Sequence, residues 1–363
     1  MNRIIKKLCS LMMAAGLISG AFALPAAAEG EAMTTVTLYE TEEAFANPMK
    51  GFRPSRYIQD NVFPQGEYVT VCKQYIKYTD LEASAEDTAD KIIAWSNESW
   101  KGIENRNLKV IPRVVIVYPQ GPDGGSAGYW PEGIDSADPV NRWLSDTLKQ
   151  RLVAFAKKLG EAWDNDPRVA AIEMGLWGRW GEHHIYPLKL QDGGDRIPKD
   201  FQKALGDAFT QAFPHKRIMV RYPETFTDYD LGFIWDSFAL PDDVSGGMGI
   251  MMRKAWKTQM ISGETAYDWG NQSRLGGSPN GTLRSEKNTD YVIDWIKRMH
   301  ASSLGWIAEY TATDPKVIPN AARMQKALGY RYVIHQAAYT GSVSPDGTLD
   351  LDFEVSNVGS APF

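Results

Sequence analysis

The sequence predicts an α/β protein, a (β/α)8 TIM barrel followed by the start of a C-terminal β-sandwich. Strand-like and helix-like runs alternate from about residue 50, as is typical of a parallel sheet covered by helices. Eight strand candidates can be counted, the number that closes such a barrel. No glycine-rich turn for phosphate binding follows the first strands, which disfavours an open doubly wound sheet.

The strand candidates are short runs rich in β-branched and aromatic residues. The clearest spans residues 108–118, where β-branched side chains dominate and favour an extended, buried segment. The eight candidates begin near residues 51, 69, 108, 169, 217, 232, 260 and 304.

Apolar residues recur at helical spacing between these strands. In the longest predicted helix, residues 140–163, Leu148, Leu152 and Phe155 fall on one face, as expected of a helix that covers a sheet. Further helices are predicted over residues 86–105, 198–213, 289–301 and 321–328.

The two ends of the sequence differ from the barrel pattern. Residues 1–28 combine basic residues, an apolar run and a small-residue site, so we expect a signal peptide cleaved after Ala28 and a secreted or extracytoplasmic protein. The barrel is expected over residues 29–335. Residues 336–363 contain a cleanly alternating run and are interpreted as the start of a β-sandwich that continues beyond this sequence. A terminal hairpin on the barrel is the alternative.

Charge and composition limit the classes of partner. The net charge of −6 makes nucleic acid and anionic membranes poor partners, and no later segment is apolar enough to insert into a membrane. Cys72 is the one cysteine left after signal cleavage, so no internal disulfide is expected. The 12 Trp and 16 Tyr fit either core packing or a cleft that stacks sugars. The oligomeric state stays open.

Four carboxylates stand at or after the carboxyl ends of predicted strands. They are Glu182, Asp236, Glu264 and Glu309. Because barrel active sites lie at these ends, the four are the candidates for acid–base or nucleophilic chemistry. Hydrolysis of a glycosidic bond needs two such groups, one to protonate the leaving oxygen and one to act as nucleophile or base.

Several motifs extend this interpretation to a known family. The segments Asn47–Phe52, Gly178–Glu182, Trp235–Phe238, Gly263–Glu264 and Leu328–Tyr332 resemble a secreted bacterial family catalogued as domain of unknown function 4832. The strand ends also resemble the clan of barrel glycoside hydrolases that includes the family 42 and family 2 β-galactosidases. This resemblance implies that Glu182 is the acid/base and Glu264 the nucleophile, with Asp236 and Glu309 in reserve. Gly181 occupies the position where that clan has Asn.

Strand alternation predicts which charged residues face the barrel interior. Glu173, Arg113 and Arg221 are expected to point inward, where a buried charge must be paired. An ion pair of Glu173 with either arginine is expected to be structural, whereas the two arginines could form the floor of the site. The side chains that we expect to contact substrate are Arg113, Tyr118, Trp177, Trp180, His183, His184, Arg221, Tyr222, Trp235 and Trp269.

These patterns favour a secreted, retaining glycoside hydrolase that acts on a poly- or oligosaccharide. No metal or other cofactor is expected, because the side chains of His183 and His184 diverge and no HExxH motif or cysteine pair accompanies them. Two alternatives remain. One is a non-catalytic carbohydrate-binding protein on a barrel scaffold. The other is a polysaccharide lyase, with Tyr222 as base and Arg221 facing a uronate.

Overall fold

The computed structural model describes residues 33–54, 66–119, 128–134, 138–240, 254–265, 267, 275–341, 343 and 345–362, and the backbone of residues 4–7. The chain forms two compact units. The larger comprises Ala44–Tyr330 with Ser360–Phe363, and the smaller comprises Met1–Glu43 with Arg331–Gly359. No helix among the described residues is both long and apolar enough to cross a membrane.

A curled parallel sheet forms the centre of the larger unit. Six strands pair in the order β3-β11-β10-β9-β8-β6, and a second parallel sheet has the order β4-β5-β7. Single parallel bridges, Phe52 with Val69 and Val110 with Val169, connect the two sheets. All eight predicted strands are present among the described residues, and the fourth is divided into β6 and β7. Their bounds are β3 Gly51–Arg53, β4 Val71–Lys77, β5 Lys109–Val117, β6 Ile172–Glu173, β7 Leu176–Arg179, β8 Ile218–Val220, β9 Gly232–Trp235, β10 Ile261–Glu264 and β11 Ser303–Gly305.

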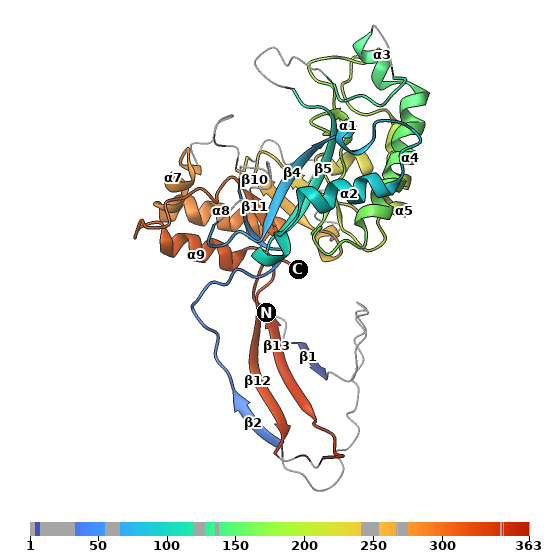
Figure 1. The fold of residues 1–363 in the computed structure, drawn as a ribbon. Coiled ribbons are helices and arrows are strands. Elements are labelled where there is room, and N and C mark those ends of the chain that lie inside the picture. Colours follow the sequence, from blue (N-terminus) through green and yellow to red (C-terminus); the bar gives the residue numbers. More distant parts are fainter. Residues whose placement is uncertain are drawn as a thin grey trace. The chain divides into compact units, whose positions relative to one another are not determined.

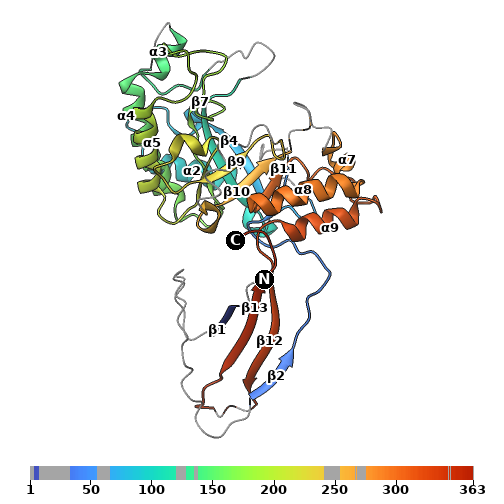
Figure 2. The same cartoon turned by 180° about the vertical axis from the view of Figure 1, so that it is seen from behind.

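Helices follow the strands and cover the outer face of the sheet. In α4, Leu148, Leu152 and Phe155 are buried as predicted, and the Ser145 hydroxyl caps the first turn by accepting from Leu148 N. Helix α4 lies beside α5, and α8 beside α9, in both views (Figure 1, Figure 2). The helices are α1 Tyr78–Leu81, α2 Ala89–Ser99, α3 Pro139–Trp143, α4 Asp146–Trp163, α5 Lys199–Ala212, α7 Pro279–Leu283, α8 Glu286–Met299 and α9 Ile318–Ala327.

The strand interiors are layered. Val71, Ile111, Ala171 and Met219 belong to one small apolar cluster near the amino ends of the strands. Two residues further along each strand, the inward position is taken by a charged side chain, because side chains alternate between the two faces. The apolar layer therefore lies below a charged layer. The charged members, all buried, are Lys73, Arg113, Glu173 and Arg221.

The smaller unit is an antiparallel sheet of both chain ends, with the order β1-β13-β12-β2. It consists of β1 Ile4–Lys7, β2 Met33–Thr37, β12 Tyr332–Thr340 and β13 Leu351–Asn357. The predicted boundary at residue 336 is therefore corrected to Arg331, because β12 is continuous and cannot be divided between the barrel and the tail. Strand β2 was not predicted from the sequence. The described residues contain no second layer that would make this sheet a sandwich.

Candidate functional site

A cavity of about 610 Å³ lies at the carboxyl ends of the parallel strands. Most of its lining comes from residues at the last position of a strand or just beyond it, which is where loops of such folds form sites. The lining residues are Tyr75, Tyr118, Trp180, Glu182, His184, Arg221, Tyr222, Asp236, Ser237, Leu240, Glu264 and Trp306.

Glu264, the last residue of β10, is held by two buried cations. Its Oε1 atom lies 2.7 Å from Arg53 Nη2 and 2.9 Å from Lys73 Nζ. Burial alone would raise the pKa of Glu264, but the charges of Lys73 and Arg53 outweigh it and hold the pKa far below the ordinary value. Glu264 is therefore an ionised carboxylate at one wall of the cavity.

A further buried carboxylate, Glu173, lies between Lys73, which also binds Glu264, and Arg113. Its Oε2 atom is 3.1 Å from Lys73 Nζ and 2.7 Å from Arg113 Nε. Arg113 Nη1 in turn donates to Glu182 Oε1 at 3.0 Å. The predicted pairing of Glu173 with Arg113 is thus present, and it belongs to a chain of alternating charges that runs beneath the cavity from Glu264 to Glu182.

Glu182 is engaged through both oxygens. While Arg113 binds Oε1, His184 Nε2 lies 3.5 Å from Oε2. Burial works to raise the pKa of Glu182, but His184, Arg113 and Arg221 together lower it below its usual range. Glu182 therefore faces the cavity as a second carboxylate.

The pKa of Asp236 is shifted in the opposite direction to those of Glu182 and Glu264. It follows β9, and its Oδ1 atom contacts Arg221 Nε and accepts from Ser237 Oγ at 3.4 Å. Burial and the negative charge of Glu182 raise its pKa despite the contact with Arg221. The cavity thus combines carboxylates that stay ionised with one acid that retains its proton to higher pH.

The turn that carries Glu182 has an unusual backbone. Trp180 and His183 have φ of 53° and 61°, and Gly178 and Gly181 have φ of 89° and 68°. A Cβ at Gly181 would lie 2.9 Å from the Cα of Gly175, closer than side chains tolerate. The packing explains why glycine precedes Glu182 here, since the Cβ of an Asn at this position would clash with the backbone of Gly175.

The two adjacent histidines point to different surroundings. His184 lines the cavity, whereas His183 is fully buried with its ring 4.9 Å from that of Phe226. Burial lowers the pKa of His183 to about 3, so the ring is neutral. The structure therefore places His183 outside the cavity, contrary to its expected contact with substrate.

Two of the predicted tryptophans are core residues. Trp177 donates to Trp143 O at 3.0 Å and packs between Trp143 and Phe201. Trp235 is fully buried against Phe238 and Trp295. Neither indole lines the cavity, so the structure corrects both expectations.

The other predicted residues divide between the cavity and its surroundings. Arg113 lies beneath the cavity through its contacts with two glutamates, and Glu309 is exposed and outside the lining. Trp269 lies outside the described residues. The predicted residues that line the cavity are Tyr118, Trp180, Glu182, His184, Arg221, Tyr222, Asp236 and Glu264.

Several residues of the site were not predicted from the sequence, including two aromatic residues of the lining and two cations beneath it. Tyr75 lines the cavity next to Tyr118, with ring centroids 5.0 Å apart, and Trp306 lines it after β11. Arg53 and Lys73 hold Glu264. Lys73 and Tyr75 could have been found, because they continue the inward alternation of β4 from Val71.

The aromatic side chains of the cavity differ in how free their faces are. Arg196 Cζ lies 3.3 Å from the ring centroid of Tyr222, and Arg221 Cζ lies 4.4 Å from it. Two guanidinium groups therefore lie over the ring of Tyr222, where a sugar would have to stack. Trp180 and Trp306, both half-buried in the lining, are better placed to present an indole to a ligand.

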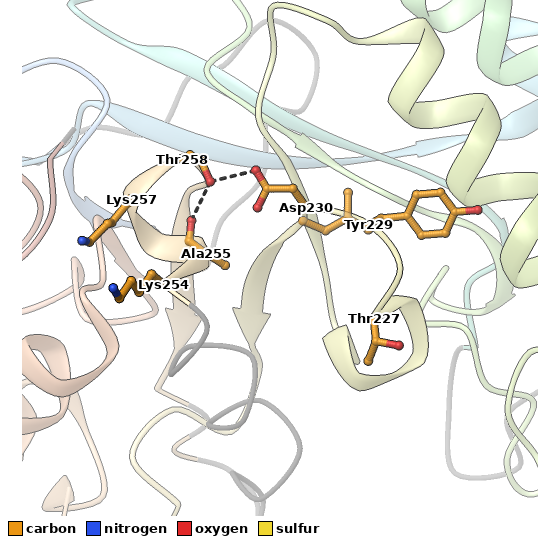
Figure 3. A pocket seen from close by; sticks show the side chains of 8 residues that line it. Thr227, Tyr229, Asp230, Lys254, Ala255, Lys257 and Thr258 are labelled. Atoms are coloured by element: carbon orange, nitrogen blue, oxygen red, sulfur yellow. Dashed lines mark hydrogen bonds between the residues drawn. The ribbon is translucent and has the colours of Figure 1, made fainter. Parts of the chain in front are cut away.

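A second pocket, of about 340 Å³, opens at the amino ends of β9 and β10 (Figure 3). There Thr258 Oγ1 donates to Asp230 Oδ2 at 2.8 Å, while Lys254 and Lys257 point away from that carboxylate. Within the described residues, no group of three or more His, Cys, Asp or Glu side chains is arranged to hold a metal ion.

No protein-family model and no curated protein sequence matches the chain. Among solved structures, it is similar to an exo-β-1,4-mannosidase from Opitutaceae bacterium strain TAV5, with 11% identity and a TM-score of 0.44, over 72% of this chain and 54% of that one. The chain thus spans about half the length of that mannosidase.

Two further similar structures are glycoside hydrolases. One is a broad-specificity endoglucanase from an uncultured bacterium, with 9% identity and a TM-score of 0.44, over 79% of this chain and 96% of that one. The other is a family 39 glycoside hydrolase from Bacteroides cellulosilyticus WH2, with 10% identity and a TM-score of 0.41, over 90% and 82%. Likeness this distant carries no argument, so the reaction is argued from the site alone.

Proposed function

We propose that the protein is a glycoside hydrolase that cleaves a poly- or oligosaccharide with retention of anomeric configuration. The observation that carries the proposal is the set of three carboxyl groups in one cavity, with the pKa of Glu264 far below its ordinary value and that of Asp236 above its own. Such a division supplies a nucleophile and a proton donor side by side.

The roles follow from the contacts. Glu264, which Arg53 and Lys73 keep ionised, is the nucleophile. The proton comes from one of the other two carboxyl groups of the cavity: Glu182, which has the position that the resemblance implies, or Asp236, which follows the neighbouring strand β9. Trp180 and Trp306 offer indole faces to the C–H face of a sugar ring.

The strands of the larger unit are consistent with a closed barrel, and the first residues with export. The strand pairings run from β3 through each successive strand to β11, which pairs with β3 again, and this circuit supports a (β/α)8 barrel. We propose further that the antiparallel sheet begins a β-sandwich and that residues 1–28 direct the chain out of the cytoplasm.

The geometry gives less support to a polysaccharide lyase. Such an enzyme needs an arginine to neutralise a uronate and a tyrosine base. Here Asp236 already binds Arg221. Burial also raises the pKa of Tyr222, so the phenolate that would act as the base forms less readily. A lyase would therefore have to break the contact between Arg221 and Asp236.

The test combines an activity screen with covalent trapping. The protein without residues 1–28 is assayed against aryl glycosides of common sugars and a panel of polysaccharides. A 2-fluoro glycoside of the sugar that is hydrolysed should then label Glu264, which peptide mass spectrometry would locate. Labelling of another residue would refute the assignment of the nucleophile. Saturable glycan binding without any hydrolysis would favour the non-catalytic carbohydrate-binding protein.

A further inference from the structure

Asp236 lies next to Glu264 across two paired strands. In the register of β9 and β10, Trp235 is opposite Gly263, so Asp236 and Glu264 occupy the following position on each strand. Neighbouring strands are about 4.8 Å apart, and retaining glycosidases hold their two carboxyl groups about 5–5.5 Å apart. The register thus places the backbones of Asp236 and Glu264 side by side, and both carboxyl groups line the same cavity.

The groups around Asp236 favour its protonated form. Both Glu182 and Glu264 face it with negative charge, and Arg221 is the cation in contact with it. Burial and the charge of Glu182 outweigh Arg221, and together with Glu264 they raise the pKa of Asp236 to about 6. Only 16% of this side chain is exposed, so little water is available to screen these charges.

Glu182 is in the opposite situation. A proton on Glu182 would have to displace the hydrogen bond from Arg113 Nη1 or the contact with His184 Nε2. Arg113 is itself held by Glu173 at 2.7 Å, so turning away from Glu182 would also break this buried ion pair. Tyr222 lines the same cavity, and burial raises its pKa.

We propose, on the basis of the hydrolase function above, that Asp236 is the proton donor of the reaction. Glu182 is then a positioning residue, whose fixed negative charge keeps the proton on Asp236. This assignment moves the acid from the fourth strand to the sixth, beside the nucleophile in the sheet.

The reaction balances with these two groups and one water. A lone pair of the Glu264 carboxylate forms a bond to the anomeric carbon, while the glycosidic C–O bond breaks and its electron pair stays on the leaving oxygen. That oxygen takes the proton of Asp236. Water then loses a proton to the Asp236 carboxylate and attacks the anomeric carbon, and the ester bond breaks to restore Glu264.

The experiment compares Asp236→Asn with Glu182→Gln on two substrates of one sugar, an aryl glycoside with a good leaving group and an unactivated oligosaccharide. Asp236→Asn should lower kcat/KM for the oligosaccharide by about 10²–10⁴-fold and affect the aryl glycoside much less. Azide should then restore turnover of the aryl glycoside, because it attacks the glycosyl ester without general base help.

The pH profile separates the donor from its neighbour. The kcat/KM of the wild type should fall as pH rises through the pKa of Asp236, because the donor must be protonated. Glu182→Gln removes a charge that raises this pKa, so the falling limb should move to lower pH. Glu161→Gln, at an exposed glutamate of α4 outside the cavity lining, is the matched control and should leave the profile in place.

The outcomes distinguish the inference from the proposed function. A leaving-group-dependent loss and azide rescue in Glu182→Gln, with neither in Asp236→Asn, would make Glu182 the donor and overturn the inference. If Asp236→Asn does not fold, the pH profile of Glu182→Gln decides: a falling limb of kcat/KM at the same pH as in the wild type would overturn the inference. A wild type without activity on any glycoside would overturn the proposed function itself.

Discussion

The two ends of strands β9 and β10 carry hollows of different chemistry. At the carboxyl ends, Asp236 and Glu264 are buried among cations in the larger cavity. At the amino ends, Asp230 accepts from Thr258 and Gln259 at the surface, in a pocket lined mainly by exposed side chains (Figure 3). The same two strands thus support a charged interior at one end and an ordinary surface at the other.

The difference arises from the layers inside the sheet. An apolar layer that includes Met219 and Ile234 closes the interior toward the amino ends, so ionisable groups there lie outside and are screened by water. Toward the carboxyl ends, the next inward positions are charged and dry, and each charge shifts the protonation of its neighbours. Burial beside an open cavity is what distinguishes the candidate site.

The largest effect is expected from Glu264→Gln, which removes the proposed nucleophile while keeping the shape of the side chain. Activity should fall by about 10⁴-fold or more, as removal of a nucleophile does in other hydrolases. Kinetics on an aryl glycoside would measure the loss. Activity within tenfold of the wild type would contradict the role of Glu264 as nucleophile, and the carboxyl-end cavity would no longer differ in function from the amino-end pocket.

The next effect is expected from Glu173→Gln. The change leaves Lys73 and Arg113 each without one buried anion, so the free energy of unfolding should fall by about 3 kcal/mol. Denaturant titration would measure it.

Glu82→Gln is the matched control, because Glu82 is equally buried but binds Arg151 and Lys158 away from the cavity. Both variants should lose stability, and only Glu173→Gln should change the pH dependence of activity. An altered profile in Glu82→Gln would show that the pH dependence reports general instability.

A smaller effect is expected from Trp180→Ala. Loss of one stacking face should raise KM about 3- to 10-fold, which corresponds to about 0.5–1.5 kcal/mol, with kcat changed less. Trp95→Ala on α2, outside the cavity, is the control. Equal changes of KM in the two variants would contradict a sugar-stacking role for Trp180.

The smallest effect is expected at the opposite end of the strands. Lys257→Ala changes a lining residue of the amino-end pocket, and stability should stay within about 0.5 kcal/mol of the wild type. The kinetic constants should not change. A large loss of activity would mean that this pocket takes part in the reaction.

Much of the fold was readable from the sequence, because period-two and helical patterns report directly which side chains are buried. Residues 108–118 and 140–163 are examples, and the structure confirms both as β5 and α4 with small shifts of their ends. The inward orientation of Arg113 and Glu173 followed from the same alternation.

The site was less readable, because its geometry depends on backbone conformations that no pattern encodes. Leu176, with a φ of 71°, interrupts the alternation of the fourth strand, so Trp177 turns to the helices instead of the cavity. Trp306 has a φ of 65°, and β11 ends just before it at Gly305, five residues before the run of strand-like residues stops at Tyr310. Pairing partners of Glu264, which come from two other strands, could not be inferred without the register of the sheet.

The left-handed backbone at Trp180 and His183 has a consequence for engineering this protein. A side chain at such a position lowers the free energy of unfolding by about 1–2 kcal/mol relative to glycine. Both positions belong to the turn that presents Glu182 and His184 to the cavity. Selection of variants for heat resistance alone would favour glycine or asparagine there and would remove the indole from the cavity. A library screened by thermal stability should therefore be filtered by turnover in the same round.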